Sequence, residues 1–490
     1  MNRALRRISI AVLVMFILLL VNVNYLQGFA PASLASKPNN ARAFEAQFQY
    51  QRGNIVTADG VTIAESKPSN DEFKYKRYYP YGPMYAPVTG YDTLYSQTGI
   101  EKAKDSLLSG SDSALTVRNV IDLLTGKQRK GANVTLTINS KAQAAAYNAL
   151  VALGKPGAVV ALNPKTGAIL AMASYPSYDP NVLAAHDGAK LNRADRQLLT
   201  DKAQPLLNRA LEGTYPPGST FKIVTSSALF TQSPNTTVNT NVDSPTQLTL
   251  PQTTHVLHND LGEACGNGSG QTPLIVAFAQ SCDTTFAKIG MQLGAPALND
   301  MAEKFGMNDP NLTVPLPVAQ SDYVMPPSQA LTAFSAIGQF SDTVTPLQEA
   351  MFAAAIANGG TLMKPYLVQQ VTASDLSTVQ TTSQAVLSQA VSSPVASNVG
   401  QMMLAVVQQP EGTAFAFRQG VTGIEIAGKT GTAETGQFSL NDAVFTSFAP
   451  FANPDIAVGV IIQGGGYGAS AAAPIAVQVI KAYQSALGSQ

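Results

Sequence analysis

The chain has 490 residues, which predicts more than one domain, because single hydrophobic cores rarely extend beyond roughly 250–300 residues. Its 31 basic and 31 acidic side chains leave no net charge, and only 13% of residues are charged, which argues against a nucleic-acid partner. The 45% share of hydrophobic residues excludes a disordered chain.

An uncharged stretch near the N-terminus predicts a membrane anchor over residues 1–27. Arg3, Arg6 and Arg7 precede residues 8–36, which carry no charge, and the most apolar part is 8–23. A bilayer-spanning helix needs about 20 mainly apolar residues. Basic residues before the helix favour a cytoplasmic N-terminus. A cleaved signal peptide is the alternative, and both interpretations export the rest of the chain.

A linker rich in Pro, Ala, Ser and Asn is expected over residues 28–45, followed by a small extended, mainly β domain over 46–135. Residues 51–64 read as a β-hairpin, with Asp59 and Gly60 at its turn. Residues 114–124 are expected to be helical, and Asp59 is interpreted as a turn residue only.

A second domain is predicted over residues 136–490, beginning near the strand-like residues 134–138. Asn139 or Ser140 could cap a helix over 141–153. A hairpin then pairs residues 157–162 with 168–173. Strands at both ends of the domain with helices between them predict a mixed α/β (α+β) layer. The remaining elements are expected to be helices at 219–230, 273–293, 346–358, 394–409 and 474–487, and strands at 423–427, 443–450 and 456–463.

The Ser/Thr-rich segment at 372–393 retains recurring apolar residues, so it is expected to be a surface excursion and not a linker between domains.

The stretch YPPGSTFK at residues 215–222 carries the first candidate for chemistry. Its prolines and glycine favour a turn that enters a helix. Ser219 and Lys222, three residues apart, would share one face of that helix. A lysine amine can serve as the base that activates a serine hydroxyl if its pKa is lowered. Such a pair also occurs by chance in many helices.

Two further motifs follow along the chain. Ser281-Cys282-Asp283 lies between two helical patterns, and Lys429-Thr430-Gly431-Thr432 lies on an apolar strand that starts near Ile424. Ser-x-x-Lys, a Ser-x-Asn type triplet and Lys-Thr-Gly, in this order, are the signature of penicillin-binding proteins and class A β-lactamases.

With these motifs the chain resembles a class B penicillin-binding protein, most nearly the penicillin-binding protein A type of actinobacteria. The resemblance extends to RGNI at 52–55 and to VALNPKTG at 160–167. It implies a penicillin-binding-protein/serine β-lactamase-like transpeptidase domain. The implied activity is cross-linking of peptidoglycan stem peptides that end in D-Ala-D-Ala. It also implies acylation by β-lactams, no cofactor, and a membrane glycan polymerase among the elongation or division proteins as partner.

The resemblance also implies roles for the motif residues. Ser219 would be the acylated nucleophile, Lys222 its base, Ser281 a proton relay to the leaving amine, and Lys429 a positive charge beside Lys222. The hydroxyls implied to bind the substrate carboxylate belong to Thr430 and Thr432. Gly431 would let the substrate lie close to the strand, and the N–H groups of residues 219 and 432 would form the oxyanion hole.

Asp283 departs from the family pattern, which usually has asparagine there. An ionised aspartate only accepts hydrogen bonds, so it could pair with Lys222 and raise its pKa, which opposes a role as base. Alternatively, Asp283 accepts hydrogen bonds from the backbone or from the substrate amide, as a substrate-binding residue.

The two cysteines, Cys265 and Cys282, leave three interpretations open. A disulfide is typical of an exported protein with an even number of cysteines. The second interpretation is that both cysteines are free thiols. The third is a zinc site that the cysteines form with His255 and His258, although the irregular spacing of these four residues argues against zinc.

Two other functions remain possible from the residues. In a D,D-carboxypeptidase or β-lactamase, water would resolve the acyl-enzyme, although the anchor and the extra domain argue against a β-lactamase. A membrane sensor or scaffold that only binds its ligand is the non-enzymatic alternative.

Overall fold

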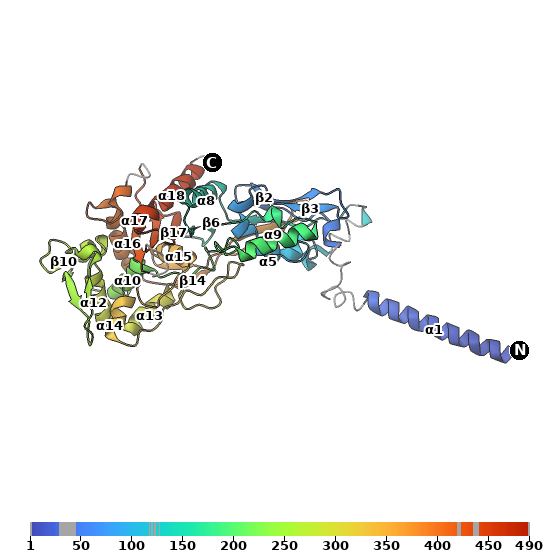
Figure 1. The fold of residues 1–490 in the computed structure, drawn as a ribbon, viewed down its shortest axis with the longest axis horizontal. Helices are drawn as coiled ribbons and strands as arrows, with labels where there is room; N and C mark the ends of the chain where they lie inside the picture. The colour runs from blue at the N-terminus through green and yellow to red at the C-terminus, as the bar shows by residue number, and fades with distance from the viewer. Residues whose placement is uncertain are drawn as a thin grey trace.

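The computed structural model describes residues 2–28, 46–116, 118, 121, 124–126, 128–418, 423–434 and 441–488. The predicted linker at 28–45 lies almost wholly outside these residues, and so does part of the helix expected at 114–124. Figure 1 shows a body with an all-antiparallel sheet at its centre and a second sheet toward one end.

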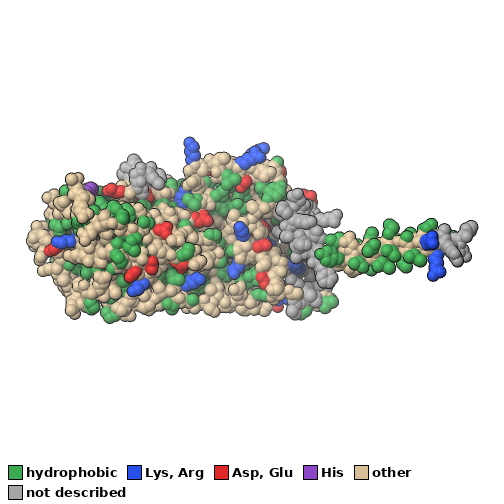
Figure 2. All heavy atoms as spheres, turned by 90° about the horizontal axis from the view of Figure 1, so that it is seen from below, with side chains coloured by type: hydrophobic (Ala, Val, Ile, Leu, Met, Phe, Trp, Pro, Cys, Tyr) green, Lys and Arg blue, Asp and Glu red, His purple; other side chains and the backbone are tan. Residues whose placement is uncertain are grey.

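Helix α1 spans Asn2–Gly28, and residues 5–26 have a mean hydropathy of 2.4. Within the described chain it is the one helix long and apolar enough to cross a membrane. Its side chains are exposed, and Figure 2 shows them as a nearly continuous apolar surface with basic side chains near the outer end.

The central sheet has five strands in the order β15-β16-β17-β5-β6. Nearly all of its residues are buried, as expected for a sheet covered on both faces. The strands are β15 (Ala427–Ala433), β16 (Asp442–Ala449), β17 (Ile456–Ile462), β5 (Gly157–Leu162) and β6 (Ile169–Tyr175). The hairpin and the last two strands are confirmed. The strand predicted at 423–427 is wrong, because β15 begins only at Ala427 and carries the Lys-Thr-Gly motif itself.

Helices α8 (Ser140–Leu153) and α18 (Ala473–Leu487) cover one face of this sheet, and α15 (Pro346–Ala357) covers the other (Figure 1). The predicted cap of α8 is confirmed, since Asn139 Oδ1 accepts a hydrogen bond from Ala142 N. The other helices of this part are α10 (Lys222–Gln232), α11 (Leu274–Ala279), α12 (Asp283–Leu293), α13 (Ala295–Lys304), α14 (Gln329–Ser335), α16 (Ser393–Gln408) and α17 (Gly468–Ala471). Helix α17 contacts β15, β16 and α18. The helical region predicted at 273–293 consists of α11 and α12, separated at residues 280–282, which agrees with the placement of Ser281-Cys282-Asp283 between two helical patterns.

The second sheet has six strands in the order β13-β12-β4-β1-β2-β3. Their bounds are β13 (Thr378–Thr381), β12 (Val368–Thr372), β4 (Asn133–Leu136), β1 (Ile55–Val56), β2 (Thr62–Pro68) and β3 (Tyr75–Tyr78). The predicted hairpin forms between β1 and β2. Strands β12 and β13 therefore extend from the C-terminal part of the chain to the sheet of the N-terminal part, and the segment at 372–393 is more than a surface excursion.

Short elements complete both parts. Two-stranded sheets join β7 (Asn241–Asp243) to β10 (Gln271–Pro273), β8 (Gln247–Thr249) to β9 (Val256–His258), and β11 (Thr361–Met363) to β14 (Val386–Gln389). Helices α4 (Ala86–Thr89), α5 (Gly99–Ala103), α6 (Asp105–Leu108) and α9 (Gly188–Thr200) accompany the six-stranded sheet. Asp59 in the β1–β2 turn is more than a turn residue, because its carboxylate accepts hydrogen bonds from Ser140 N and Oγ at the start of α8.

Candidate active site

The first motif forms a tight turn that leads into a buried helix. Residues Gly218–Phe221 form the 3-10 turn η5, which continues directly into α10. Ser219 is partly exposed at this turn, whereas the Lys222 side chain is fully buried one turn on. The turn approaches β15 closely, since a Cβ on Gly218 would lie 2.8 Å from Thr432 O. The nucleophile candidate therefore lies against the strand that carries the third motif.

The second motif occupies the break between α11 and α12. Ser281 has a φ of +61°, a left-handed conformation that costs a residue with a side chain roughly 1–2 kcal/mol. The next residue, Cys282, forms a disulfide with Cys265. This conformation turns the Ser281 side chain toward the lysines of the other two motifs.

The polar side chains of the three motifs form one connected chain of hydrogen bonds. Lys429 Nζ donates to Ser281 Oγ at 2.7 Å. Lys222 Nζ lies 3.2 Å from the same hydroxyl and donates to Ser281 O at 2.7 Å. Lys222 Nζ also lies 2.7 Å from Asp283 Oδ1. The structure thus brings together residues from three separate segments, with Ser219 at the cleft surface in front of them.

The environment lowers the proton affinity of both amines. Burial lowers the pKa of Lys222, and the charge of Asp283 and its hydrogen bond oppose that shift. Burial also lowers the pKa of Lys429 well below its usual value, helped by the neighbouring Lys222 and opposed by Asp283. With one carboxylate for two amines, the site favours one charged and one neutral lysine.

Asp283 takes the first of the two arrangements expected for it, since its carboxylate pairs with Lys222. It remains 22% exposed and lines the cleft, so the same carboxylate is also reachable from the substrate side.

The cleft in front of Ser219 has a volume of about 850 Å³. Thr430 and Thr432 line it, as the resemblance implied. Thr430 Oγ1 shares a 2.7 Å hydrogen bond with Thr413 Oγ1. The sequence holds a signal for Thr413, because it lies in the Glu-Gly-Thr-Ala run at 411–414 that precedes the Lys-Thr-Gly motif.

Gly431 has a structural role in addition to the one expected for it. A Cβ on Gly431 would lie 2.8 Å from Pro217 O and 3.2 Å from Thr220 Cγ2. On the side to which a side chain would project, the turn that carries Ser219 fills the space, and the expected contact with substrate stays a prediction. Gly431 brings β15 and η5 into contact, which sets the distance between the first and third motifs.

Gln339 was not found from the sequence, because no motif surrounds it. Its Nε2 donates to Thr432 O at 2.9 Å, and its Oε1 accepts from Glu434 N at 3.4 Å. It thereby holds the end of β15 beside the cleft, which it also lines.

Three of the four candidate zinc ligands have other partners in this structure. The disulfide takes up Cys265 and Cys282, and the ring of His255 packs on Phe334 with centroids 5.3 Å apart. In the described part of the chain, no group of three or more His, Cys, Asp or Glu residues is arranged to hold a metal ion.

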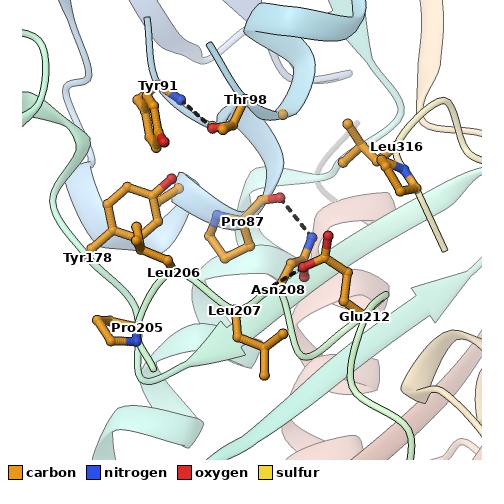
Figure 3. Close-up of a pocket in the computed structure, with 14 residues that line it drawn as sticks. Pro87, Tyr91, Thr98, Tyr178, Pro205, Leu206, Leu207, Asn208, Glu212 and Leu316 are labelled. Carbon is orange, nitrogen blue, oxygen red and sulfur yellow. Dashed lines mark hydrogen bonds between the residues drawn. The ribbon is translucent and has the colours of Figure 1, made fainter. Parts of the chain in front are cut away.

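A second pocket, of about 160 Å³, lies where α4 and α5 meet the loop before η5 (Figure 3). Asn208 joins the two sides, since its Nδ2 donates to Pro87 O at 3.0 Å and its backbone N–H donates to Glu212 Oε2 at 3.3 Å. None of the predicted site residues lines this pocket. It marks the junction between the two parts of the body.

Comparison with known proteins gives two family matches. Residues 157–481 match the penicillin binding protein transpeptidase domain, and residues 52–134 match the penicillin binding protein A dimerisation domain. Peptidoglycan D,D-transpeptidase PbpA of Mycolicibacterium smegmatis is 41% identical to the chain over 494 residues, covering 98% of this chain and 99% of the relative. PbpA of Mycobacterium tuberculosis is 40% identical over 496 residues, with the same coverage.

Solved structures agree with this relationship. The imipenem acyl-enzyme complex of penicillin-binding protein A from M. tuberculosis superimposes with a TM-score of 0.85 at 39% identity, covering 90% of this chain and 99% of that one. The penicillin G acyl-enzyme complex gives a TM-score of 0.84 at 39% identity, with 89% and 100% covered. The chain belongs to the penicillin-binding protein transpeptidase family.

Proposed function

We propose that this chain is a peptidoglycan D,D-transpeptidase that cross-links stem peptides ending in D-Ala-D-Ala and that β-lactams acylate at Ser219. The observation that carries the proposal is the convergence of Ser219, Lys222, Ser281 and Lys429, from three separate segments, on one cleft. The relatives named above are peptidoglycan D,D-transpeptidases, and two of the solved neighbours are β-lactam acyl-enzymes.

In the first half-reaction, Ser219 Oγ attacks the carbonyl carbon between the two D-alanines. Lys222, as the neutral amine that burial favours, takes the serine proton. The backbone N–H groups of Ser219 and Thr432 stabilise the oxyanion, each donor contributing roughly 3 kcal/mol. Collapse breaks the C–N bond, and Ser281 passes a proton to the departing amine of the terminal D-alanine. The product is an ester between Ser219 and the shortened peptide.

In the second half-reaction, an amine of another stem peptide attacks this ester. A new amide bond forms, and Ser219 recovers its proton through the same lysine and serine. Lys429 attracts the substrate carboxylate when it carries the proton that Lys222 lacks, while the hydroxyls of Thr430 and Thr432 donate hydrogen bonds to that carboxylate. The shared hydrogen bond between Thr413 and Thr430 orients the hydroxyl of Thr430 for this contact.

Mass spectrometry of the intact full chain treated with penicillin tests the proposal. The wild-type chain is expected to gain the mass of one penicilloyl group, with peptide mapping at Ser219. Ser219→Ala should gain none, and Lys222→Ala should be acylated far more slowly. Ser233→Ala, at an exposed position just beyond α10, is the matched control and should react as wild type. An unmodified wild-type chain would refute the proposal.

The fate of the acyl-enzyme separates transpeptidation from hydrolysis. A long-lived penicilloyl adduct supports the transpeptidase, whereas rapid turnover of penicillin would indicate a β-lactamase. A Ser219→Ala chain that fully supports growth would favour a scaffold role instead.

The division at residue 135, with a non-catalytic part at 46–135 and the transpeptidase part at 136–490, is part of the proposal. A single-pass topology with a cytoplasmic N-terminus is also part of the proposal, and the basic residues at the start of α1 support it. Protease added outside spheroplasts should digest the catalytic part and spare a tag on residue 1.

A membrane glycan polymerase is the partner we propose, because the roughly ninety residues before the transpeptidase part are too few for a glycosyltransferase domain. Cross-linking through α1 would test that contact.

A further inference from the structure

Behind the Ser219 turn lies a carboxyl group that the reaction described above does not use. Glu349 is in the first turn of α15 and is completely buried. Its Oε1 lies 2.7 Å from the hydroxyl of Thr220, the residue next to Ser219. Its Oε2 has no hydrogen-bond partner in the described chain. A buried carboxylate with an unpaired oxygen is costly, so its protonation state needs an explanation.

The geometry at Thr220 decides that state. Thr220 Oγ1 lies 2.8 Å from Pro217 O and 2.7 Å from Glu349 Oε1. The hydroxyl has one proton, and the Pro217 carbonyl can only accept. If Thr220 donates to Pro217 O, the proton between Thr220 and Glu349 has to come from the carboxyl group. Both short contacts are satisfied only when Glu349 is a neutral acid.

The surroundings of Glu349 agree with a neutral acid. Burial raises the pKa of Glu349 to about 8, against the lowering that a hydrogen bond donated by Thr220 to an ionised carboxylate would cause. Within the described elements packed against α15 and η5, three residues are ionisable: Asp442 on β16, Lys429 on β15 and Lys222 on α10. Both lysine amines are bonded to Ser281, and Asp442 accepts from Gly464 N. None of the three appears among the interactions that shift the pKa of Glu349.

Glu349 is also held from its backbone, which makes it a rigid support. Its carbonyl oxygen accepts a hydrogen bond of 2.5 Å from Thr446 Oγ1 on β16. Thr446 is paired across the sheet with Lys429 of the third motif. Glu349 therefore contacts the Ser219 turn through its side chain, and through its backbone it contacts the sheet that carries Lys429.

We propose that Glu349 is a positioning residue for Ser219: as a neutral acid it donates to Thr220, Thr220 donates to Pro217 O, and this two-bond chain holds the Ser219 turn against β15. Glu349 touches neither substrate nor reacting atoms and acts through Thr220. Ionisation of Glu349 removes the proton that links it to Thr220 and loosens the turn.

Rates of acylation by fluorescent penicillin, measured on the full chain in detergent, test this proposal. Glu349→Gln keeps a donor to Thr220 and should stay within about threefold of wild type at pH 7, whereas Glu349→Leu should lose about tenfold, the size of one lost buried hydrogen bond. Thr220→Val should lose a similar factor. If Glu349→Gln is as slow as Glu349→Leu, or if Glu349→Leu reacts at the wild-type rate, the proposal is overturned.

A double variant shows whether Glu349 acts through Thr220. Once Thr220→Val has removed the hydroxyl, adding Glu349→Leu should cause no further loss of rate. Losses that multiply would mean that Glu349 acts by another route and would overturn the proposal. Circular dichroism spectra and melting curves identify any variant that fails to fold, and the comparison then rests on Thr220→Val against Thr220→Ser, which keeps the hydroxyl and should react like wild type.

The pH profile supplies a readout that packing alone would not change. A group with a pKa of about 8 is protonated below that pH, so the wild-type rate relative to Glu349→Gln should be constant below pH 8 and fall above it. The infrared difference spectrum between the two proteins at pH 7 should show the carbonyl band of a protonated carboxylic acid. A ratio of rates that does not change with pH, or a carboxylate band, would overturn the proposal. The Glu349 proposal rests on the proposed function, which predicts that Ser219→Ala is not acylated whatever the state of Glu349. Acylation of Ser219→Ala would therefore refute the function, whereas the Glu349 variants test only the positioning role.

Discussion

Lys222 Nζ lies 2.7 Å from Asp283 Oδ1, at the position where the family signature has asparagine. The amine that is to act as a base is therefore paired with a carboxylate that favours its charged form. Burial of Lys222 has the opposite effect, because it lowers the pKa of the amine and favours its neutral form. The balance between the two sets the pKa of Lys222.

Asp283→Asn should shift this balance toward the neutral amine. Removing the carboxylate removes an influence that raises the pKa of Lys222, so the rise of the acylation rate with pH should move to lower pH. The pH dependence of the acylation rate with a fluorescent penicillin measures the shift. Asp243→Asn, which breaks the exposed pair with Lys288, is the matched control and should leave the profile unchanged. An unmoved profile in Asp283→Asn would show that Asp283 does not tune Lys222.

Glu101→Gln should strongly destabilise the N-terminal part of the body. Glu101 is fully buried between two guanidinium groups, with Arg52 Nε 2.7 Å and Arg77 Nε 2.5 Å from its oxygens. Burial opposes its ionisation, but Arg77 and Arg52 outweigh burial and lower the pKa of Glu101. Breaking one partner of a buried network costs about 3–5 kcal/mol.

Urea unfolding of the full chain in detergent measures the loss in Glu101→Gln. Glu65→Gln is the control, because Glu65 pairs with Lys67 at 3.4 Å on the surface and should contribute less than about 1 kcal/mol. Because the pKa of Glu101 is lowered on folding, its contribution is present above the unfolded pKa near 4.3 and is lost as the pH falls below it. Equal stability of the two variants would contradict this assignment.

Asp342→Asn should change how stability depends on pH. Burial raises the pKa of Asp342 to about 7, with a 2.7 Å hydrogen bond from Ser335 Oγ acting against the rise. A carboxyl group whose pKa is raised on folding stabilises the protein fully below its unfolded pKa, near 3.9, and loses that contribution as the pH rises toward 7. The variant has no such proton to lose.

The difference in unfolding free energy, Asp342→Asn minus wild type, should therefore grow by up to about 1.4 kcal/mol per pH unit between pH 4 and 7 and then level off. Melting curves in a pH series measure it, with Asp322→Asn, at a half-buried site that is hydrogen-bonded to Gln320, as control. A difference that is flat across this range would show that Asp342 is not buried as described.

Loss of the disulfide should destabilise the region behind Ser281. The bond closes a loop with a separation of 17 residues, and such a loop stabilises a fold by roughly 3 kcal/mol. Cys265→Ala should lose about that amount in urea unfolding. A reductant should lower the unfolding midpoint of the wild-type chain and leave that of Cys265→Ala unchanged. If the reductant affects neither protein, the cysteines are not bonded.

Local patterns in the sequence were sufficient for much of the fold. The uncharged run at 8–23 predicted α1, the segment at 141–153 predicted α8, and the two apolar runs at 157–162 and 168–173 predicted β5 and β6. These elements depend on spacing within a single segment, which the sequence displays directly. The three motifs and their order also predicted the family.

Interactions between distant segments could not be predicted in this way. Strand β12 pairs with β4 more than 230 residues earlier, so the C-terminal half contributes to a sheet that appeared to belong to the N-terminal half. The left-handed conformation of Ser281 in the break at 280–282 could not be predicted either, because the surrounding structure holds it and no glycine or proline marks it.

The sequence by itself determined the apolar N-terminal helix, the α/β pattern and the residue types available for acyl transfer, because these follow from short-range spacing and composition. Only the tertiary structure decided that Asp283 pairs with Lys222, that Gly431 receives the nucleophile turn, and that Glu349 lies behind Thr220. Each of these depends on which distant segments pack together and how deeply they are buried. Burial also sets the pKa values, so the proton positions at this site follow from the fold.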